Sequence, residues 1–120
     1  MAKILTVDDS KTMVELIKAT LEGKGHQVWT ALSGREALQI AEEETFDLIF
    51  CDVNMPEMTG ISLVSQLRKK PGFEFVPIIM VTTESGDYKK TKARTMGASG
   101  WLQKPFTPDR LLGAVKKLVG

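Results

Sequence analysis

The side chains best suited to chemistry in this sequence are acidic, and they directly follow short apolar runs. Asp8 and Asp9 follow the run at residues 4–7, and Asp52 follows a run that ends at Cys51. Three carboxylates gathered in a partly dry crevice would repel one another and raise one another's pKa values unless a cation joined them. Mg²⁺ suits such a site best, because it is commonly held by one or two carboxylates and completes its shell with water and phosphate oxygens.

A hydroxyl and an ammonium follow two further apolar runs. Thr82 and Thr83 come directly after residues 76–81, and Lys104 comes directly after residues 99–103. Together with the acids, these groups would form a phosphoryl site, in which a carboxylate nucleophile, a metal ion, an ammonium and a hydrogen-bond donor surround one phosphoryl group. An acyl phosphate on Asp52 is the intermediate that this set implies.

Each of these residues, taken alone, also has a purely structural explanation. Asp8, Asp9 and Ser10 precede a predicted helix and could cap it, and Asp52 could be an ordinary loop residue. Thr82 is also an ordinary strand residue, and Lys104 an ordinary solvated lysine. The functional interpretation depends on their joint placement, because four independent coincidences would have to fall at the ends of four predicted strands.

Alternating strand and helix patterns position these residues. Short apolar, β-branched runs predict strands, and apolar residues at helical spacing predict the helices between them. The predicted strands cover residues 4–7, 27–31, 47–51, 76–81 and 99–103, and the predicted helices cover residues 10–22, 34–43, 60–70, 86–96 and 108–119. This pattern favours an α/β fold, a doubly wound parallel sheet of five strands covered on both faces. Ligands of such sheets bind beyond the carboxyl ends of the strands, where the candidate residues lie.

Two predicted helices carry recognisable start signals. Ser33 with Glu36 three residues later has the spacing of a capping box, and Thr107 stands before Pro108 as a cap residue before a first-turn proline. These signals support the predicted helices that begin at residues 34 and 108.

Composition excludes several classes of protein. The 120 residues include 16 Lys or Arg and 15 Asp or Glu, which give a formal net charge of +1, and 42% of them are hydrophobic. This length and apolar content suit one domain, which we expect to span residues 1–120 without an output domain. The apolar runs are far shorter than the about 20 residues of a membrane-spanning helix. No secretory signal is visible, so we expect a cytoplasmic protein. The near-zero charge argues against nucleic-acid binding, and the lone Cys51 cannot form an internal disulfide or supply a zinc site.

Five short motifs follow one another along the chain. They are Val7-Asp8-Asp9, the stretch from Asp52 to Gly60 (DVNMPEMTG), the stretch from Met80 to Glu84 (MVTTE), Gly97-Ala98 and Lys104-Pro105-Phe106. In this order the motifs resemble the receiver domain of two-component response regulators, in particular the stand-alone chemotaxis type. The resemblance covers the whole chain and implies the flavodoxin-like strand order 2-1-3-4-5.

The resemblance implies a role for each acidic residue. Asp52 would accept a phosphoryl group from the phosphohistidine of a partner kinase. Asp9 and Asp52 would ligate Mg²⁺ directly, Asp8 would act largely through water, and the backbone carbonyl of Asn54 would complete the protein's share of ligands. Mg²⁺ is the only cofactor implied.

The resemblance also implies roles for residues around the acids. Lys104 would pair with one phosphoryl oxygen, and the Thr82 hydroxyl would move to bond another. The Lys104-Pro105 peptide bond would be cis. Asn54 and Glu84 stand two residues after Asp52 and Thr82, where the family tunes how fast the phosphoryl group is lost.

A partner-binding surface is implied on the predicted fourth helix, fifth strand and fifth helix. Trp101 stands at the position of the family's switching aromatic residue, where Tyr or Phe is more usual. The alternative explanation of Trp101 is that it is a partly buried packing residue without a switching role. The basic segment at residues 89–94 would suit an acidic partner, and its alternative is a solvated helix face. The residues assigned to this surface are Trp101, Tyr88, Lys89, Lys90, Lys92 and Lys117.

The function implied is a phosphorylation-activated switch in bacterial chemotaxis or flagellar motor control. Such a protein is not an enzyme beyond its own phosphorylation and dephosphorylation. The expected partners are a chemotaxis-type histidine kinase, a flagellar motor switch protein and a phosphatase, with no nucleic acid and no membrane insertion. We expect a monomer.

Three other functions are alternatives to this one. A phosphorelay intermediate would pass its phosphoryl group to a histidine phosphotransfer protein. An aspartyl-phosphate phosphatase of the haloacid-dehalogenase type also uses Mg²⁺, but it would want an acid at position 54, where this chain has Asn54. A flavodoxin-like cofactor carrier would want a Ser-, Thr- or Gly-rich phosphate loop, where Asp8 and Asp9 would instead repel phosphate.

Overall fold

Five parallel strands form one sheet in the computed structural model, which describes residues 1–83, 91–92 and 94–119. The strands are β1 (Lys3–Val7), β2 (Gln27–Ala31), β3 (Leu48–Asp52), β4 (Ile78–Thr82) and β5 (Gly100–Gln103). Their order across the sheet is β2-β1-β3-β4-β5. The predicted fold class and strand order are therefore confirmed.

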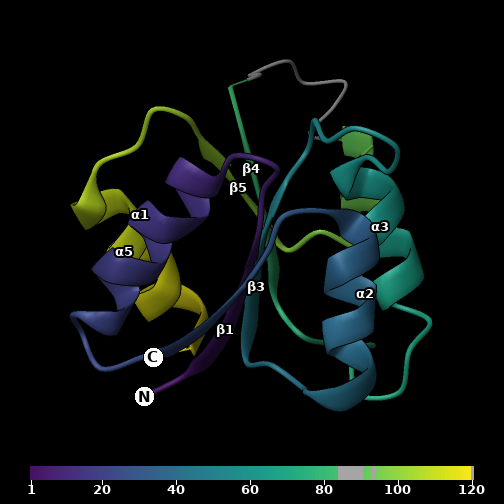
Figure 1. Cartoon of the computed structure of the whole chain (residues 1–120), viewed down its shortest axis with the longest axis horizontal. Helices are drawn as coiled ribbons and strands as arrows, with labels where there is room; N and C mark the ends of the chain where they lie inside the picture. The colour runs from purple at the N-terminus through teal and green to yellow at the C-terminus, as the bar shows by residue number, and fades with distance from the viewer. Residues whose placement is uncertain (84–90, 93, 120) are drawn as a thin grey trace.

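Helices cover both faces of the sheet. The described helices are α1 (Lys11–Glu22), α2 (Gly34–Glu43), α3 (Gly60–Leu67) and α5 (Pro108–Val119). Helices α1 and α5 lie on one face, and α2 and α3 lie on the other (Figure 1). Residues 91–92 and 94–95 are helical, and most of the remaining helix predicted at residues 86–96 lies outside the described residues.

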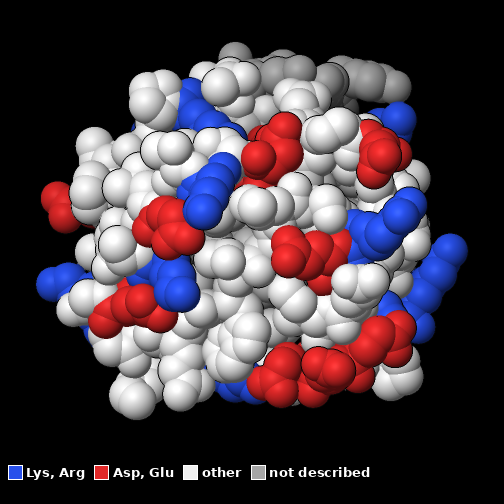
Figure 2. All heavy atoms as spheres, in the orientation of Figure 1, with Lys and Arg blue, Asp and Glu red and all other residues white. Residues whose placement is uncertain are grey.

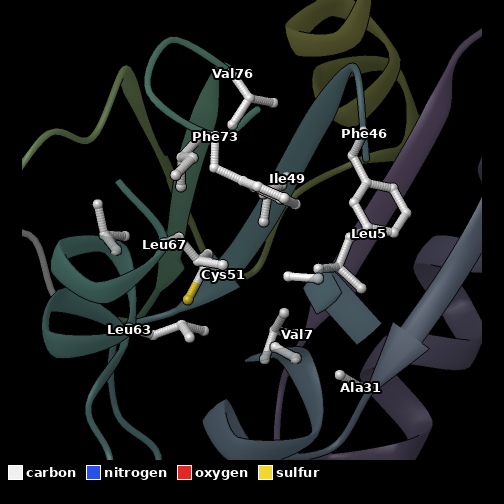
Figure 3. Close-up of a cluster of buried hydrophobic side chains, with 14 of the residues drawn as sticks. Leu5, Val7, Ala31, Phe46, Ile49, Cys51, Leu63, Leu67, Phe73 and Val76 are labelled. Atoms are coloured by element: carbon white, nitrogen blue, oxygen red, sulfur yellow. The ribbon is translucent and has the colours of Figure 1, made fainter. Parts of the chain in front are cut away.

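The buried side chains divide into two clusters, one on each face of the sheet. Successive residues of a strand point to opposite faces, so Ile49 and Cys51 belong to one cluster, and Leu48 and Phe50 belong to the other. Figure 3 shows the cluster that contains Cys51. All five residues of β3 are buried, because this strand lies between β1 and β4 with helices on both sides. The central strand β3 is thus enclosed along its whole length, as is its neighbour β4, and it ends at Asp52.

A hydroxyl side chain caps the start of each described helix. The accepting oxygens and the backbone N–H groups that they bind are Ser10 with Met13, Ser33 with Glu36, Thr59 with Ser62, and Thr107 with Arg110. Ser33 and Thr107 therefore cap their helices as predicted, but the Glu36 carboxylate, which would complete a capping box, accepts the N–H of Leu32 instead of that of Ser33. Of Asp8, Asp9 and Ser10, which could all cap the first helix, Ser10 is the residue whose side chain does so.

Two predicted element bounds are wrong for one physical reason. The helix predicted at residues 60–70 ends at Leu67, and the strand predicted from residue 76 begins at Ile78. The guanidinium of Arg68 donates hydrogen bonds to the carbonyl oxygens of Phe73 and Val76. These bonds turn the chain back beside the end of α3, and they occupy the Val76 carbonyl before the ladder of β4 begins.

We expect Thr6→Val to stabilise the fold by about 1 kcal/mol, because it removes a buried hydroxyl that has no compensating hydrogen bond. Thr6 is 1% exposed, and its Oγ1 has no hydrogen-bond partner in the described part of the chain. Urea unfolding measures the change. The matched control is Thr6→Ser, which keeps the hydroxyl and loses a buried methyl, and which should destabilise the fold. A valine variant no more stable than the parent would show that the Thr6 hydroxyl is satisfied in solution.

Candidate functional site

The carboxyl ends of four neighbouring strands carry the candidate residues. Asp8 follows β1, Asp52 is the last residue of β3, Thr82 is the last residue of β4, and Lys104 follows β5. Because the four strands are adjacent and parallel, these ends meet at one edge of the sheet. The backbone N–H of Lys104 donates to the Thr82 carbonyl at 2.7 Å, so the ladder between β4 and β5 continues into the site.

Asp8, Asp9 and Asp52 form a cluster of three carboxylates. One oxygen atom of each lies within 4.8 Å of one oxygen of the others. Asp8 is 3% exposed and Asp52 is 6% exposed, while Asp9 is exposed to solvent. One Asp8 oxygen accepts the backbone N–H of Ser10 at 2.9 Å, which orients that carboxylate at the end of β1. The structure thus brings together all three acids that the sequence singled out.

Lys104 is the cation that faces this cluster. Its Nζ lies 2.7 Å from Oδ2 of Asp8 and 3.5 Å from Oδ1 of Asp52. Burial alone would lower the pKa of Lys104, but the hydrogen bond to Asp8 and the charges of Asp52 and Asp8 raise it above its usual range. The side chain therefore stays an ammonium. The Lys104-Pro105 peptide bond is cis, as expected.

The environment of Asp52 disfavours its charged form. Burial raises the pKa of Asp52 to about 6, the negative charge of Asp8 adds to the effect, and Lys104 opposes it only in part. The described residues place one cation, Lys104, against three carboxylates, so a divalent cation would relieve the remaining repulsion. Carboxylate oxygens, partly exposed through Asp9, are the donor set that Mg²⁺ prefers, and the site fits that ion.

The loop after β3 is closed tightly against the site. The Gly60 backbone N–H donates to the Val53 carbonyl at 2.9 Å, and a Cβ atom on Gly60 would overlap the backbone carbonyl of Asp52. Asn54 is an exposed residue of this loop, two positions after Asp52. The sequence placed Gly60 in a motif but did not reveal this steric role. The role depends on the contact between the start of α3 and the end of β3, which local sequence does not show.

Cys51 lies directly before Asp52 and is fully buried. Burial raises the pKa of its thiol, and the charges of Asp52 and Asp8 raise it further. Since the thiolate is the reactive form, we expect Cys51 to resist a disulfide reagent such as dithiobisnitrobenzoate while the chain is folded, and to react fully in urea. Release of thionitrobenzoate measures this reaction. Fast labelling of the native chain would contradict the burial of β3.

The candidate partner-binding residues are only partly described. Trp101 in β5 is half-buried and packs against the cluster of Figure 3, and exposed Lys117 lies on α5. Trp101 and Lys117 both line a surface groove of about 290 Å³ between β5 and α5. Lys92 is exposed and lies at a second groove, beside α3. The other residues assigned from the sequence, Glu84, Tyr88, Lys89 and Lys90, lie outside the described residues.

Charge is mixed over the face that Figure 2 presents. Acidic and basic side chains are interspersed there, and acidic ones gather along the lower edge, over the lower end of α2 (Figure 2). Neither sign dominates this face, in agreement with a net charge of +1. In the described part of the chain, every helix is too short or too polar to cross a membrane.

Comparisons with known proteins identify the family. The model of the response regulator receiver domain matches residues 4–116. A chemotaxis protein CheY homolog of Campylobacter jejuni is 41% identical over 120 residues, which cover 98% of this chain and 92% of that protein. The Bacillus subtilis alkaline phosphatase synthesis transcriptional regulatory protein PhoP is 38% identical over 98% of this chain, and the chain spans 48% of PhoP's length.

A solved structure agrees with these sequence matches. The chemotaxis response regulator CheY4 of Vibrio cholerae superimposes with a TM-score of 0.96 at 44% identity, and the match covers 99% of each chain. Family members of this kind are generally signalling switches and not enzymes with a separate substrate. The match of the family model over residues 4–116, together with these relatives, shows that the chain belongs to the response regulator receiver domain family.

Proposed function

We propose that this chain is a phosphorylation-activated switch in bacterial chemotaxis, and that Asp52 is its phosphoryl acceptor. The observation that carries the proposal is that one partly buried ammonium, Lys104, contacts both Asp8 and Asp52 at the carboxyl end of β3. The chemotaxis names of the relatives from Campylobacter jejuni and Vibrio cholerae support the choice of pathway.

The proposed reaction moves a phosphoryl group from a histidine of a partner kinase to Asp52. A carboxylate oxygen of Asp52 forms a bond to phosphorus, the bond from phosphorus to the imidazole nitrogen breaks, and its electron pair returns to the imidazole. The product is an acyl phosphate. Asp52 must be ionised to attack, and its buried position at the end of β3 holds it in one orientation for transfer.

The residues around Asp52 would stabilise the transferred group. Lys104 carries a positive charge within reach of Asp52, and the buried Thr82 hydroxyl ends the neighbouring strand. Asp8, Asp9 and Asp52, with the backbone carbonyl of Asn54, would hold Mg²⁺, which neutralises phosphoryl charge when it is bound. Asn54 and Glu84 would tune how long the phosphoryl group persists.

The output would be a change in partner binding. We propose that Thr82 moves toward the phosphoryl group and that Trp101 responds, which alters the surface that contains Trp101, Tyr88, Lys89, Lys90, Lys92 and Lys117. The partners would be a chemotaxis-type histidine kinase, a flagellar motor switch protein and a phosphatase, and the chain would act as a cytoplasmic monomer.

We expect beryllofluoride, a phosphoryl mimic, to shift backbone NMR signals at Thr82, Trp101 and Lys117 when Mg²⁺ is present. The mimic would bind at Asp52, and β4 and β5 would carry the change to the groove that Trp101 and Lys117 line. Asp52→Asn is the control and should show no shifts. Shifts confined to residues within the acidic cluster would contradict the proposed output surface.

Phosphotransfer from a chemotaxis histidine kinase tests the function as a whole. Kinase labelled with radioactive phosphate should lose its label to this chain within seconds to minutes, and Asp52→Asn should accept none. A labelled product that then passes its phosphoryl group to a histidine phosphotransfer protein would favour the alternative, a phosphorelay intermediate. Failure of the parent chain to accept label from the kinase would contradict the proposal.

A further inference from the structure

Arg68, the residue that ends α3, has an unusual set of hydrogen bonds. Its Nε and Nη2 donate to the carbonyl of Gly97 at 3.2 and 2.6 Å, and its Nη1 donates to the carbonyls of Phe73 and Val76 at 2.9 and 2.6 Å. One half-buried guanidinium therefore joins the end of α3 to two separate segments of the chain.

Those two segments lead directly into β4 and β5. Val76 lies two residues before β4, and Gly97 lies three residues before β5. Two hydrogen bonds join Ser99, just before β5, to Ile78, the first residue of β4. The Ser99 N–H donates to the Ile78 carbonyl at 2.7 Å, and the Ile78 N–H donates to the Ser99 hydroxyl at 3.0 Å. Arg68 thus holds the amino-terminal ends of the two strands whose carboxyl ends lead into the Asp52 site.

Only glycine suits position 97 beside the Arg68 guanidinium. Its φ angle is +111°, which L side chains rarely adopt, and a Cβ atom there would lie 3.0 Å from Nε of Arg68. The close approach brings the Gly97 carbonyl within reach of two guanidinium nitrogens. Any larger residue at position 97 would push the side chain of Arg68 away.

The charge of Arg68 is balanced by carbonyl dipoles. Burial lowers the pKa of Arg68, but a guanidinium stays protonated. None of the ion pairs among the described residues includes Arg68. Its guanidinium instead lies at the carboxyl end of α3, where a positive charge is favourable, and donates hydrogen bonds to three carbonyl oxygens. A lysine could not reproduce this arrangement, because its ammonium lacks the planar fork of donors.

We propose that Arg68 is the positioning residue of the switch, and this proposal rests on the proposed function. By fixing the amino-terminal ends of β4 and β5 against α3, Arg68 keeps the two strands in register. A displacement of Thr82 at the other end then reaches Trp101, which is paired with Met80 in the ladder, instead of being absorbed by sliding of β5 along β4.

The test measures binding and response separately in the presence of beryllofluoride and Mg²⁺. In Arg68→Gln we expect the half-saturating concentration of beryllofluoride to stay within about threefold of the parent value, since Arg68 lies outside the acidic cluster. At saturation, the shift of the Trp101 indole NMR signal should fall to less than about half of the parent shift. Trp29→Phe assigns the indole signals, because the chain has 2 tryptophans.

Matched variants separate positioning from stability. Arg35→Gln removes an exposed arginine of α2 and should leave the Trp101 response unchanged. Arg68→Lys keeps the charge but loses the fork of donors, and it provides the same test if Arg68→Gln does not fold. A full Trp101 shift in an Arg68 variant that is less stable would overturn the proposal and leave a purely structural role. No shift in the parent chain would instead mean that the proposed function has failed, and the positioning role with it.

Discussion

Replacing Gly60 with alanine is expected to destabilise the fold by about 2–3 kcal/mol and to weaken Mg²⁺ binding at the Asp52 site. The added Cβ would overlap the backbone carbonyl of Asp52 and would also lie 3.0 Å from the Cε atom of Met80. A backbone carbonyl in a central strand cannot move aside as a flexible side chain can. The start of α3 must therefore shift, together with the loop that contains Asn54.

Gly34→Ala is the matched control for this prediction. Gly34 and Gly60 are each buried, and each is the first helical residue after a hydroxyl cap, so the change in helix propensity is the same for both. A Cβ on Gly34 would lie 2.6 Å from Sδ of Met58, which can rotate away, so we expect a change of less than about 1 kcal/mol. Urea unfolding and Mg²⁺ titration followed by NMR measure both variants. Equal effects of the two substitutions would contradict the role assigned to Gly60.

Asp52→Asn is expected to stabilise the metal-free chain at pH 7.5 by about 1–2 kcal/mol. The folded chain holds the pKa of Asp52 at about 6, above its ordinary value of 3.8, so the ionised carboxylate costs folding free energy. This shift corresponds to at most about 3 kcal/mol, and the loss of the contact with Lys104 reduces the gain. The ionised Asp52 carboxylate therefore destabilises the fold, although it is the charged nucleophile that the proposed reaction needs.

The pH dependence of this gain follows from the direction of the shift. Above pH 6 the folded chain carries the full cost of the carboxylate. As the pH falls through 6, the folded state takes up a proton, and the cost disappears below about 4, where the unfolded chain is protonated as well. The advantage of Asp52→Asn should thus be largest above pH 6 and vanish near pH 4. Mg²⁺ should stabilise the parent more than the variant. If the stability gained by Asp52→Asn instead increased as the pH fell, this electrostatic explanation would be wrong.

Local sequence patterns predicted most of the fold. The runs that form the strands are short, those of β1, β2 and β4 are rich in β-branched residues, and hydroxyl caps such as Ser33 and Thr107 mark helix starts. Strand and helix identity therefore depends on near neighbours. The bounds at Leu67 and Ile78 were wrong because they depend on the hydrogen bonds that the Arg68 side chain donates to the carbonyls of Phe73 and Val76, five and eight residues further along the chain. Tertiary hydrogen bonds of this kind leave no periodic signal.

The candidate site could be located from the sequence, but its electrostatics could not. Parallel topology alone brings Asp8, Asp52 and Lys104 to one edge of the sheet. Which carboxylate is buried, and which one holds Lys104 most closely, depends on side-chain geometry: the ammonium lies nearer Asp8 than Asp52. The steric role of Gly60 likewise became visible only once α3 was placed against the end of β3.

Intact-mass spectrometry after incubation with acetyl phosphate and Mg²⁺ tests the central claim most directly. We predict one added phosphoryl group that is stable in acid and labile in base, that is absent from Asp52→Asn, and that is lost when a chelator removes the metal. Sampling at short times prevents fast hydrolysis from hiding the adduct. No adduct at any time, or an adduct that persists in Asp52→Asn, would contradict the assignment of Asp52 as the phosphoryl acceptor.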